Sequence, residues 1–209
     1  VVARAAGPLR VGSSQYCAVT RGGEGLSELV GYAANRPYRA MVEAKGATTI
    51  AHQAEVLLEE TVKRIASLVA HWQSLGFIHG VMNTDNMLLS GQTIDYGPCA
   101  FVDTYKADAK FSAIDSQGRY RLSNQPGIAH WNTSVLASCL LKVLNSEEDK
   151  AIAFAQAVID EFPRWYAEAY KARMAAKLGL DAFREEDTAL VDNFLQTLET
   201  DALDLTLAY

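Results

Sequence analysis

Four side chains in one short stretch of the sequence are of types that bind metal ions or move protons. They are His79, Asp85, Asn86 and Asp95, and Asp95 opens an Asp-Tyr-Gly triplet. Mg²⁺ prefers hard oxygen ligands and usually keeps waters and substrate phosphates in its shell. One carboxylate and one amide oxygen are therefore enough protein ligands when a nucleotide supplies the rest. Because Asn and Asp are also common turn residues, the order and spacing of all four side chains carry the inference.

The order of these residues matches the metal-holding half of a kinase-like active site. In protein kinases the loop H-R-D-x-x-x-x-N precedes D-F-G, and its Asn and the second Asp bind Mg²⁺. His79 and Asn86 are seven positions apart, as in that loop. Val81 stands where a kinase has its catalytic Asp, and the nearest replacement is Asp85. We therefore expect that the metal ligands are kept, that the base has moved, and that His79 is structural.

The elements around this stretch must position the side chains. Two short apolar runs flank Ser90-Gly91, which predicts a tight hairpin that brings Asn86 and Asp95 close together. Helical periodicity, with Thr48 or Thr49 as a cap and Gly76 as a stop, predicts a long helix with one buried face. We expect a mainly α protein with a few short strands near the hairpin. The expected helices cover 26–34, 48–75, 127–144, 146–162, 163–178 and 185–203, and Trp131 is expected to be buried. Residues 1–16 are expected to be irregular, and residues 103–125 are expected to form a surface loop.

Composition narrows the class of protein. The 209 residues carry a formal charge of −6, which argues against bulk nucleic-acid binding. No apolar run is long enough to span a bilayer, so we expect no membrane partner. The three cysteines are widely spaced, which predicts buried free thiols. The chain begins at Val1 and shows no targeting segment, so we expect a piece of a longer protein, cytoplasmic if bacterial and mitochondrial if eukaryotic.

The first residues hold two arginines, Arg4 and Arg10, beside Gly7-Pro8. One interpretation is a solvated basic linker. The other is that one or both guanidinium groups face a phosphate, whose geometry suits their planar fork. Composition alone leaves both interpretations open.

Several longer strings resemble one family. HGVMNTDNM, TIDYGPCAFVD, GRY and NQPGIAHWN are similar to the selenoprotein O family, the protein adenylyltransferases with a kinase-like fold, and so are LRVGSSQY, HWQSLGFIHG and RMAAKLGL. The resemblance covers nearly all of the chain. It implies a protein-kinase-like C-lobe over 1–209: a leading segment with phosphate-pocket arginines (1–47), the long helix with the catalytic and metal-binding loop (48–125), and a helical subdomain (126–209).

The resemblance also implies an activity and its residues. Family members transfer AMP from ATP to Ser, Thr or Tyr hydroxyls of proteins and release pyrophosphate. By position, Asp85 matches the proton acceptor, Asn86 and Asp95 match the ligands of Mg²⁺ (or Mn²⁺), and Asp95 also lies against the nucleotide phosphates. Arg10 matches one of two arginines of the phosphate pocket. The family spaces that pair by seven residues, whereas Arg4 and Arg10 are six apart, so either one residue is deleted or Arg4 is not the equivalent.

The chain departs from the family pattern at both ends. The glycine-rich segment, Lys and Glu of the preceding lobe are absent, as is the C-terminal redox Cys or selenocysteine, so we expect these 209 residues alone to bind ATP poorly. Two alternatives stay open: a small-molecule phosphotransferase of the aminoglycoside-kinase type, which Val81 disfavours, and a non-catalytic pseudokinase fragment.

Overall fold

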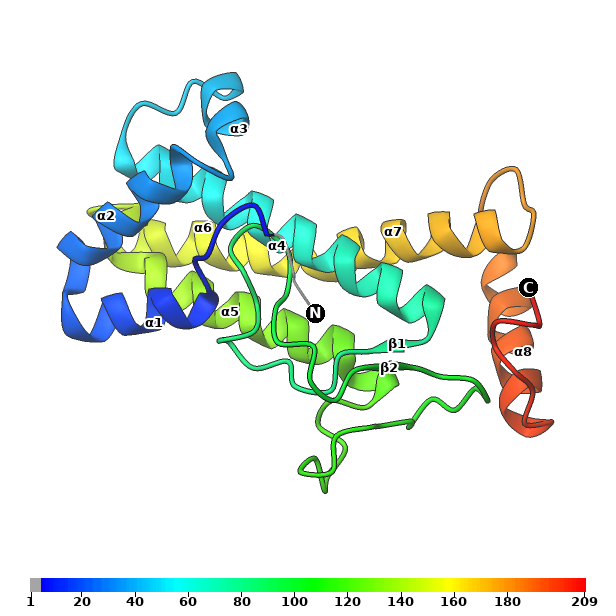
Figure 1. Cartoon of the computed structure of the whole chain (residues 1–209). Helices are drawn as coiled ribbons and strands as arrows, with labels where there is room; N and C mark the ends of the chain where they lie inside the picture. The colour runs from blue at the N-terminus through cyan, green and yellow to red at the C-terminus, as the bar shows by residue number, and fades with distance from the viewer. Residues whose placement is uncertain (1–4) are drawn as a thin grey trace. The chain divides into compact units, whose positions relative to one another are not determined.

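The computed structural model describes residues 5–209 and divides into two compact units (Figure 1). Unit 1 holds the described residues up to Ile65 together with Asn83–Asp95 and Ala129–Pro163, and unit 2 holds Ala66–Met82, Tyr96–Ile128 and Arg164–Tyr209. The protein is mainly helical, as predicted. The helices are α1 (Val11–Thr20), α2 (Gly22–Ala34), α3 (Arg39–Ala44), α4 (Ile50–Leu75), α5 (Gln125–Leu144), α6 (Glu148–Asp160), α7 (Phe162–Lys177) and α8 (Asp187–Thr200), with a short 3₁₀ turn at Leu122–Asn124.

Helix α4 begins and ends where the sequence predicts. The Thr49 hydroxyl accepts the backbone N–H of His52 at 3.2 Å, which satisfies one of the free donors of the first turn. Gly76 ends the helix at φ 66°, a left-handed conformation that favours glycine. Within unit 1 its apolar face is buried, and each such side chain contributes roughly 1.5–3 kcal/mol. These buried residues are Val56, Leu57, Leu58, Val62 and Ile65.

Helix α1 corrects the expectation that residues 1–16 are irregular, because it begins at Val11, directly after the Gly-Pro segment. Its first N–H groups are satisfied by distant backbone. The N–H of Val11 donates to the carbonyl of Met87 at 2.9 Å, and that of Gly12 donates to the carbonyl of Thr84 at 3.0 Å. A helix start normally leaves these groups without intrahelical partners. Tertiary hydrogen bonds therefore decide where α1 begins.

Other boundaries differ in smaller ways. Helix α2 begins four residues before the predicted start at Leu26, α3 was not predicted, and α8 is shorter than expected at both ends. The prediction that Trp131 is buried is wrong, since 48% of it is exposed. The cysteines are free, as predicted, but they are half-buried rather than buried.

Unit 2 contains a two-stranded antiparallel sheet, β1 (Phe77–Ile78) with β2 (Ala100–Phe101). Phe77 pairs with Phe101, and Ile78 pairs with Ala100. The sheet lies beside a small core of buried apolar side chains. In this core, residues near the C-terminus pack against the loop 103–125. That core consists of Ile78, Val102, Leu122, Leu198 and Leu205.

The fully buried side chain of Gln125 organises this sheet. Its amide oxygen accepts the N–H of His79 at 3.0 Å, and its amide nitrogen donates to the carbonyl of Phe77 at 2.8 Å. We expect Gln125→Leu to lower the free energy of unfolding by about 2–5 kcal/mol, because each buried backbone group left unsatisfied costs about 1–3 kcal/mol. Chemical denaturation measures this change, with the exposed Gln117→Leu as control. Equal stability of the two variants would contradict this role for Gln125.

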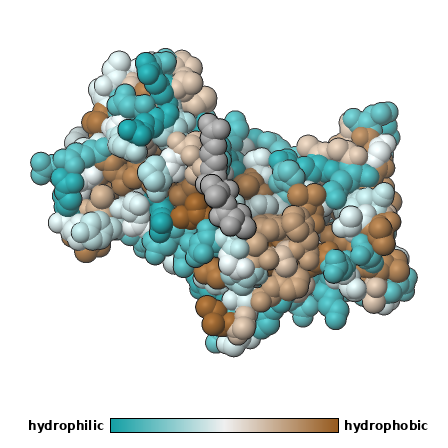
Figure 2. All heavy atoms as spheres, viewed as in Figure 1, coloured by the Kyte–Doolittle hydropathy of each residue, from teal (hydrophilic) through white to brown (hydrophobic). Residues whose placement is uncertain are grey.

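Figure 2 shows hydrophilic residues over much of the α1–α3 part of unit 1, with small hydrophobic areas between them. Among the described helices, none combines the length and the apolar character needed to cross a bilayer.

Candidate active site

The side chain of Asn83 shapes the turn in the predicted catalytic loop. The amide oxygen of Asn83 accepts the backbone N–H of Asp85 at 3.0 Å and that of Asn86 at 3.1 Å. An Asn side chain that accepts a hydrogen bond from the backbone two residues further on is typical of a tight turn. The turn leaves Asp85 exposed and buries Asn86, which is 5% exposed.

The hairpin predicted between Asn86 and Asp95 is present, although it is made of an isolated bridge rather than of strands. Met87 pairs with Thr93, and Gly91 turns the chain at φ 75°. At its open end the N–H of Ile94 donates to the carbonyl of Asn86 at 3.2 Å. The backbone of the two predicted metal ligands is therefore brought together, since Asp95 follows Ile94 directly.

Asp95 has an unusual backbone conformation. Its φ is 63°, in the left-handed region that only Gly adopts without strain and that Asn and Asp tolerate better than other residues. Such strain costs about 1–3 kcal/mol and is concentrated at functional sites. The side chain is exposed. The conformation turns the chain sharply at the residue predicted to bind both metal and phosphate.

Arg10 is brought to the catalytic loop by backbone pairing. Arg10 forms an antiparallel bridge with Leu88, and the N–H of Leu89 donates to the carbonyl of Leu9 at 2.8 Å. At the start of α1, a Cβ atom on Gly12 would overlap the Asp85 carboxylate. Glycine at position 12 therefore makes room for the predicted base.

Arg10 and Asp85 line the same cavity, which has a volume of about 560 Å³. This size lies within the ~300–1,000 Å³ typical of small-molecule sites. Both charged groups are on its wall, a cation suited to phosphate and a carboxylate suited to accept a proton. Neither Asn86 nor Asp95 is among its lining residues. Leu9, helices α1 and α2 and the residue between those helices complete the walls. The lining residues they provide are Leu9, Gly12, Ser13, Tyr16, Cys17, Arg21, Gly25, Glu28, Leu29 and Tyr32.

His79 and Arg4 are the remaining positions that the sequence singled out. His79, in unit 2, is fully buried, and its Nδ1 atom accepts the N–H of Val81 at 3.3 Å, which agrees with a structural role. Arg4 lies outside the described residues.

The donor set fits a metal whose shell is completed by a nucleotide. In the described part of the chain, no three His, Cys, Asp or Glu side chains are grouped so that they could hold an ion by themselves. Asn86 and Asp95, whose backbones meet at the open end of one hairpin, have oxygen-bearing side chains of the kind that suits Mg²⁺ and Mn²⁺. A site with so few protein ligands is typical of ions that bind together with phosphates.

Comparison with known proteins identifies the family. The family model described as protein adenylyltransferase SelO matches residues 1–209. The chain belongs to the SelO family. The expected resemblance to selenoprotein O proteins is confirmed over the whole sequence.

Curated relatives in the SelO family carry the name protein nucleotidyltransferase YdiU. The relative from Anoxybacillus flavithermus is 48% identical over 202 residues, which is 97% of this chain and 41% of the relative. The relative from Geobacillus kaustophilus is 46% identical over 95% of this chain. The relative from Bradyrhizobium diazoefficiens is 42% identical over 98% of this chain, and each of these two matches covers 40% of the relative. The chain thus spans about two-fifths of the length of these relatives.

The sequence analysis missed the α1–α2 wall of the cavity. Tyr16, Cys17 and Arg21 were not candidates, because their types and spacing indicate no site, although Tyr16 ends the family-like string LRVGSSQY. Gly12 could have been recognised in the sequence, because it is a glycine only two residues after the candidate Arg10. A glycine within a helix is unfavourable unless something approaches its backbone closely.

Proposed function

We propose that this chain carries the catalytic centre of a protein adenylyltransferase, which transfers AMP from ATP to Ser, Thr or Tyr hydroxyls of proteins and releases pyrophosphate. Membership of the SelO family supports this proposal, and so do the relatives named as protein nucleotidyltransferases. The structural observation that carries it is that Arg10 and Asp85 line one cavity. A kinase-like C-lobe over 1–209 is the fold that goes with this proposal.

In the proposed reaction, the acceptor hydroxyl oxygen attacks the α-phosphorus of ATP. A bond forms between that oxygen and phosphorus, and the bond from the α-phosphorus to the oxygen bridging to the β-phosphate breaks. Pyrophosphate leaves with the electron pair of that bond. The carboxylate of Asp85 accepts the hydroxyl proton, a role that typically contributes about 10²–10⁴-fold to rate. Arg10 faces the phosphates and offsets their charge.

Asn86 and Asp95 are the proposed protein ligands of Mg²⁺ or Mn²⁺. A bound divalent cation would neutralise phosphate charge and orient the leaving group. The hairpin holds Asn86 and Asp95 in place through the hydrogen bond from Ile94 to the carbonyl of Asn86 at 3.2 Å.

Position-specific labelling of ATP tests the proposal. The protein at its natural full length is incubated with an acceptor protein, Mn²⁺ or Mg²⁺, and ATP labelled at either the α- or the γ-phosphorus. We expect protein-bound label from α-labelled ATP only. Label from the γ-position only would mean phosphate transfer and would overturn the proposal, as would the absence of label from both positions.

The close approach of Gly12 to Asp85 gives a second test. We expect Gly12→Ala to lower AMP transfer about tenfold or more, because the added methyl group turns the Asp85 carboxylate away and general-base catalysis typically contributes about 10²–10⁴-fold. The fold should not suffer, since alanine is roughly 0.5–1 kcal/mol better than glycine inside a helix. The initial rate of AMP transfer measures the activity of the variant, and thermal unfolding measures its stability.

Gly23→Ala in α2 is the matched control, because a Cβ there meets nothing within 4 Å. Full activity of Gly12→Ala, or activity that falls only in proportion to lost stability, would contradict the steric role.

A further inference from the structure

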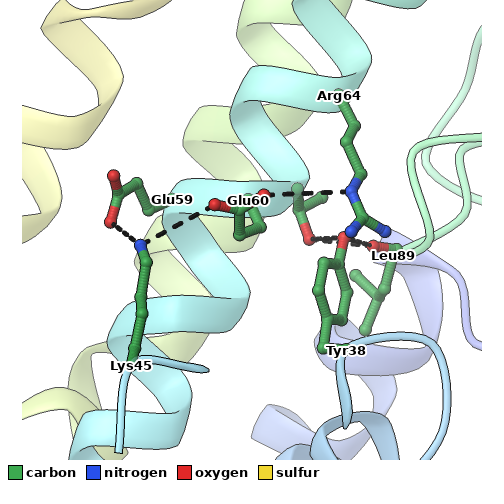
Figure 3. A network of polar contacts seen from close by, with 7 residues as sticks. Tyr38, Lys45, Glu59, Glu60, Arg64 and Leu89 are labelled. Atoms are coloured by element: carbon green, nitrogen blue, oxygen red, sulfur yellow. Dashed lines mark hydrogen bonds and ion pairs between the residues drawn. The ribbon is translucent and has the colours of Figure 1, made fainter. Parts of the chain in front are cut away.

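One backbone carbonyl in unit 1 accepts hydrogen bonds from two buried hydroxyl groups. The hydroxyl of Tyr38, just before α3, and that of Thr61, on α4, both donate to the carbonyl of Leu89, the latter at 2.9 Å (Figure 3). The two hydroxyl oxygens are 3.0 Å apart. Both side chains are fully buried, and Leu89 is too. A carbonyl oxygen has two lone pairs, so both are used here.

Leu89 occupies a central place in the hairpin that joins Asn86 to Asp95. Its N–H donates to the carbonyl of Leu9 at 2.8 Å, next to Arg10, while its carbonyl is held by the hydroxyls. One residue thus connects the Arg10 segment, the metal-binding hairpin and the helices behind them. A two-stranded hairpin is marginally stable by itself in water, so its geometry depends on such anchors.

Arg64 supports the same hairpin from α4. Its guanidinium carbon lies 4.5 Å from the centre of the Tyr38 ring, in cation–π contact. A Cβ atom on Gly91 would overlap the stem of the Arg64 side chain, so the turn rests directly on it. Figure 3 shows Glu60 between Arg64 and Lys45, with distances of 4.0 Å and 3.7 Å to their nitrogen atoms. The turn and the Tyr38 ring are therefore packed onto one face of α4.

We propose that Tyr38 and Thr61 are positioning residues for metal binding: by holding the Leu89 carbonyl, their hydroxyls keep Asn86 and Asp95 at the separation that a shared cation needs. This inference rests on the proposed function, in which Asn86 and Asp95 are the ligands. Misplacement of catalytic groups by about 1 Å can lower rates about 10²-fold.

The hydroxyl of Tyr38 is suited to donate a lasting hydrogen bond to the Leu89 carbonyl. Burial raises the pKa of its hydroxyl to about 12, so the hydroxyl keeps its proton at neutral pH. A phenylalanine at this position would keep the ring against Arg64 and remove only the donor.

Direct metal binding tests the proposal without relying on turnover. Free Mn²⁺ is measured by electron paramagnetic resonance as the full-length protein is titrated in the presence of ATP. We expect the double variant Tyr38→Phe/Thr61→Val to bind Mn²⁺ about tenfold more weakly, a loss of ~1.4 kcal/mol. Each single change should have a smaller effect, and Thr61→Ser, which keeps the hydroxyl, should bind like wild type.

Lys45→Met is the matched control, because it removes the ion pairs with Glu59 and Glu60 at the other end of the same network and leaves the bonds to Leu89 intact. It should bind Mn²⁺ as wild type does. If the double variant loses its fold by thermal denaturation, the comparison of Thr61→Val with Thr61→Ser decides the question.

The outcomes separate this inference from the proposed function. If Asp95→Asn weakens Mn²⁺ binding while the double variant matches wild type, the positioning role is wrong and the metal site stands. If Asp95→Asn binds Mn²⁺ as tightly as wild type, the assignment of the ligands fails, and the positioning role fails with it. A double variant and a Lys45→Met variant that weaken equally would show general destabilisation and would overturn the specific role.

Discussion

Asp85→Asn is expected to reduce AMP transfer by about 10²–10⁴-fold while ATP binding stays nearly unchanged, because this carboxylate is the proposed proton acceptor. Asparagine has the same shape and keeps the space beside Gly12 filled. The turn also persists, since the Asn83 side chain bonds the backbone N–H of residue 85 and not its side chain. The change therefore removes basicity and little else.

Initial rates with a saturating acceptor protein, combined with calorimetric titration of ATP, separate these effects. Asp108→Asn serves as control, because Asp108 is an exposed carboxylate in the loop of unit 2. An Asp85→Asn enzyme with a normal rate, or one whose rate falls only because ATP no longer binds, would exclude Asp85 as the base.

Asp95→Asn is expected to lower AMP transfer on the order of 10²-fold or more, because a metal ligand that also faces phosphate provides several kcal/mol of charge stabilisation and each 1.36 kcal/mol is tenfold in rate. Asparagine is the appropriate substitution here. The backbone at Asp95 has a φ of 63°, and Asn tolerates that conformation whereas Ala is strained there.

A comparison of three variants separates chemistry from strain at this position. Asp95→Gly relieves the backbone and removes the ligand, Asp95→Asn keeps the shape and removes the charge, and Asp95→Ala removes the ligand and adds strain. We expect all three to be nearly inactive, with only Asp95→Ala clearly less stable by thermal denaturation. Activity in Asp95→Gly close to that of wild type would rule out a ligand role.

The parts of the fold that follow local rules could be predicted. Helix α4 was located from its apolar periodicity, with Thr48 or Thr49 as its cap and Gly76 at its end. In the structure Thr49 is the cap, and Gly76 ends the helix as predicted. The turn at Ser90-Gly91 was predicted from the two apolar runs around it. In each case the residues that decide the structure are neighbours in the sequence, so their pattern is visible without a fold.

The parts decided by distant contacts could not be predicted. Helix α1 begins at Val11 because Met87 and Thr84 accept its first hydrogen bonds, far along the chain. The same pairing brings Arg10 and Asp85 to the wall of one cavity, which therefore has no local signature in the sequence. The Tyr38–Thr61–Leu89 contacts join three segments, and none of those residues belongs to a recognisable motif.

The resemblance to the SelO family provided the roles that spacing alone left open. Residue order indicated a metal site at Asn86 and Asp95 and left the base uncertain, because Val81 occupies the usual position. The family pattern assigned that role to Asp85. The structure adds a cavity wall that Asp85 shares with Arg10, which is a physical reason for the assignment.

The central claim is that Asn86, Asp95 and Asp85 act on one nucleotide–metal complex. The most direct test is a crystal structure of the full-length protein with Mn²⁺ and a non-hydrolysable ATP analogue, with anomalous diffraction locating the metal. We expect a manganese peak bonded to the side-chain oxygens of residues 86 and 95, with the α-phosphate within reach of the Asp85 carboxylate. A nucleotide and metal bound away from these three residues would contradict the account.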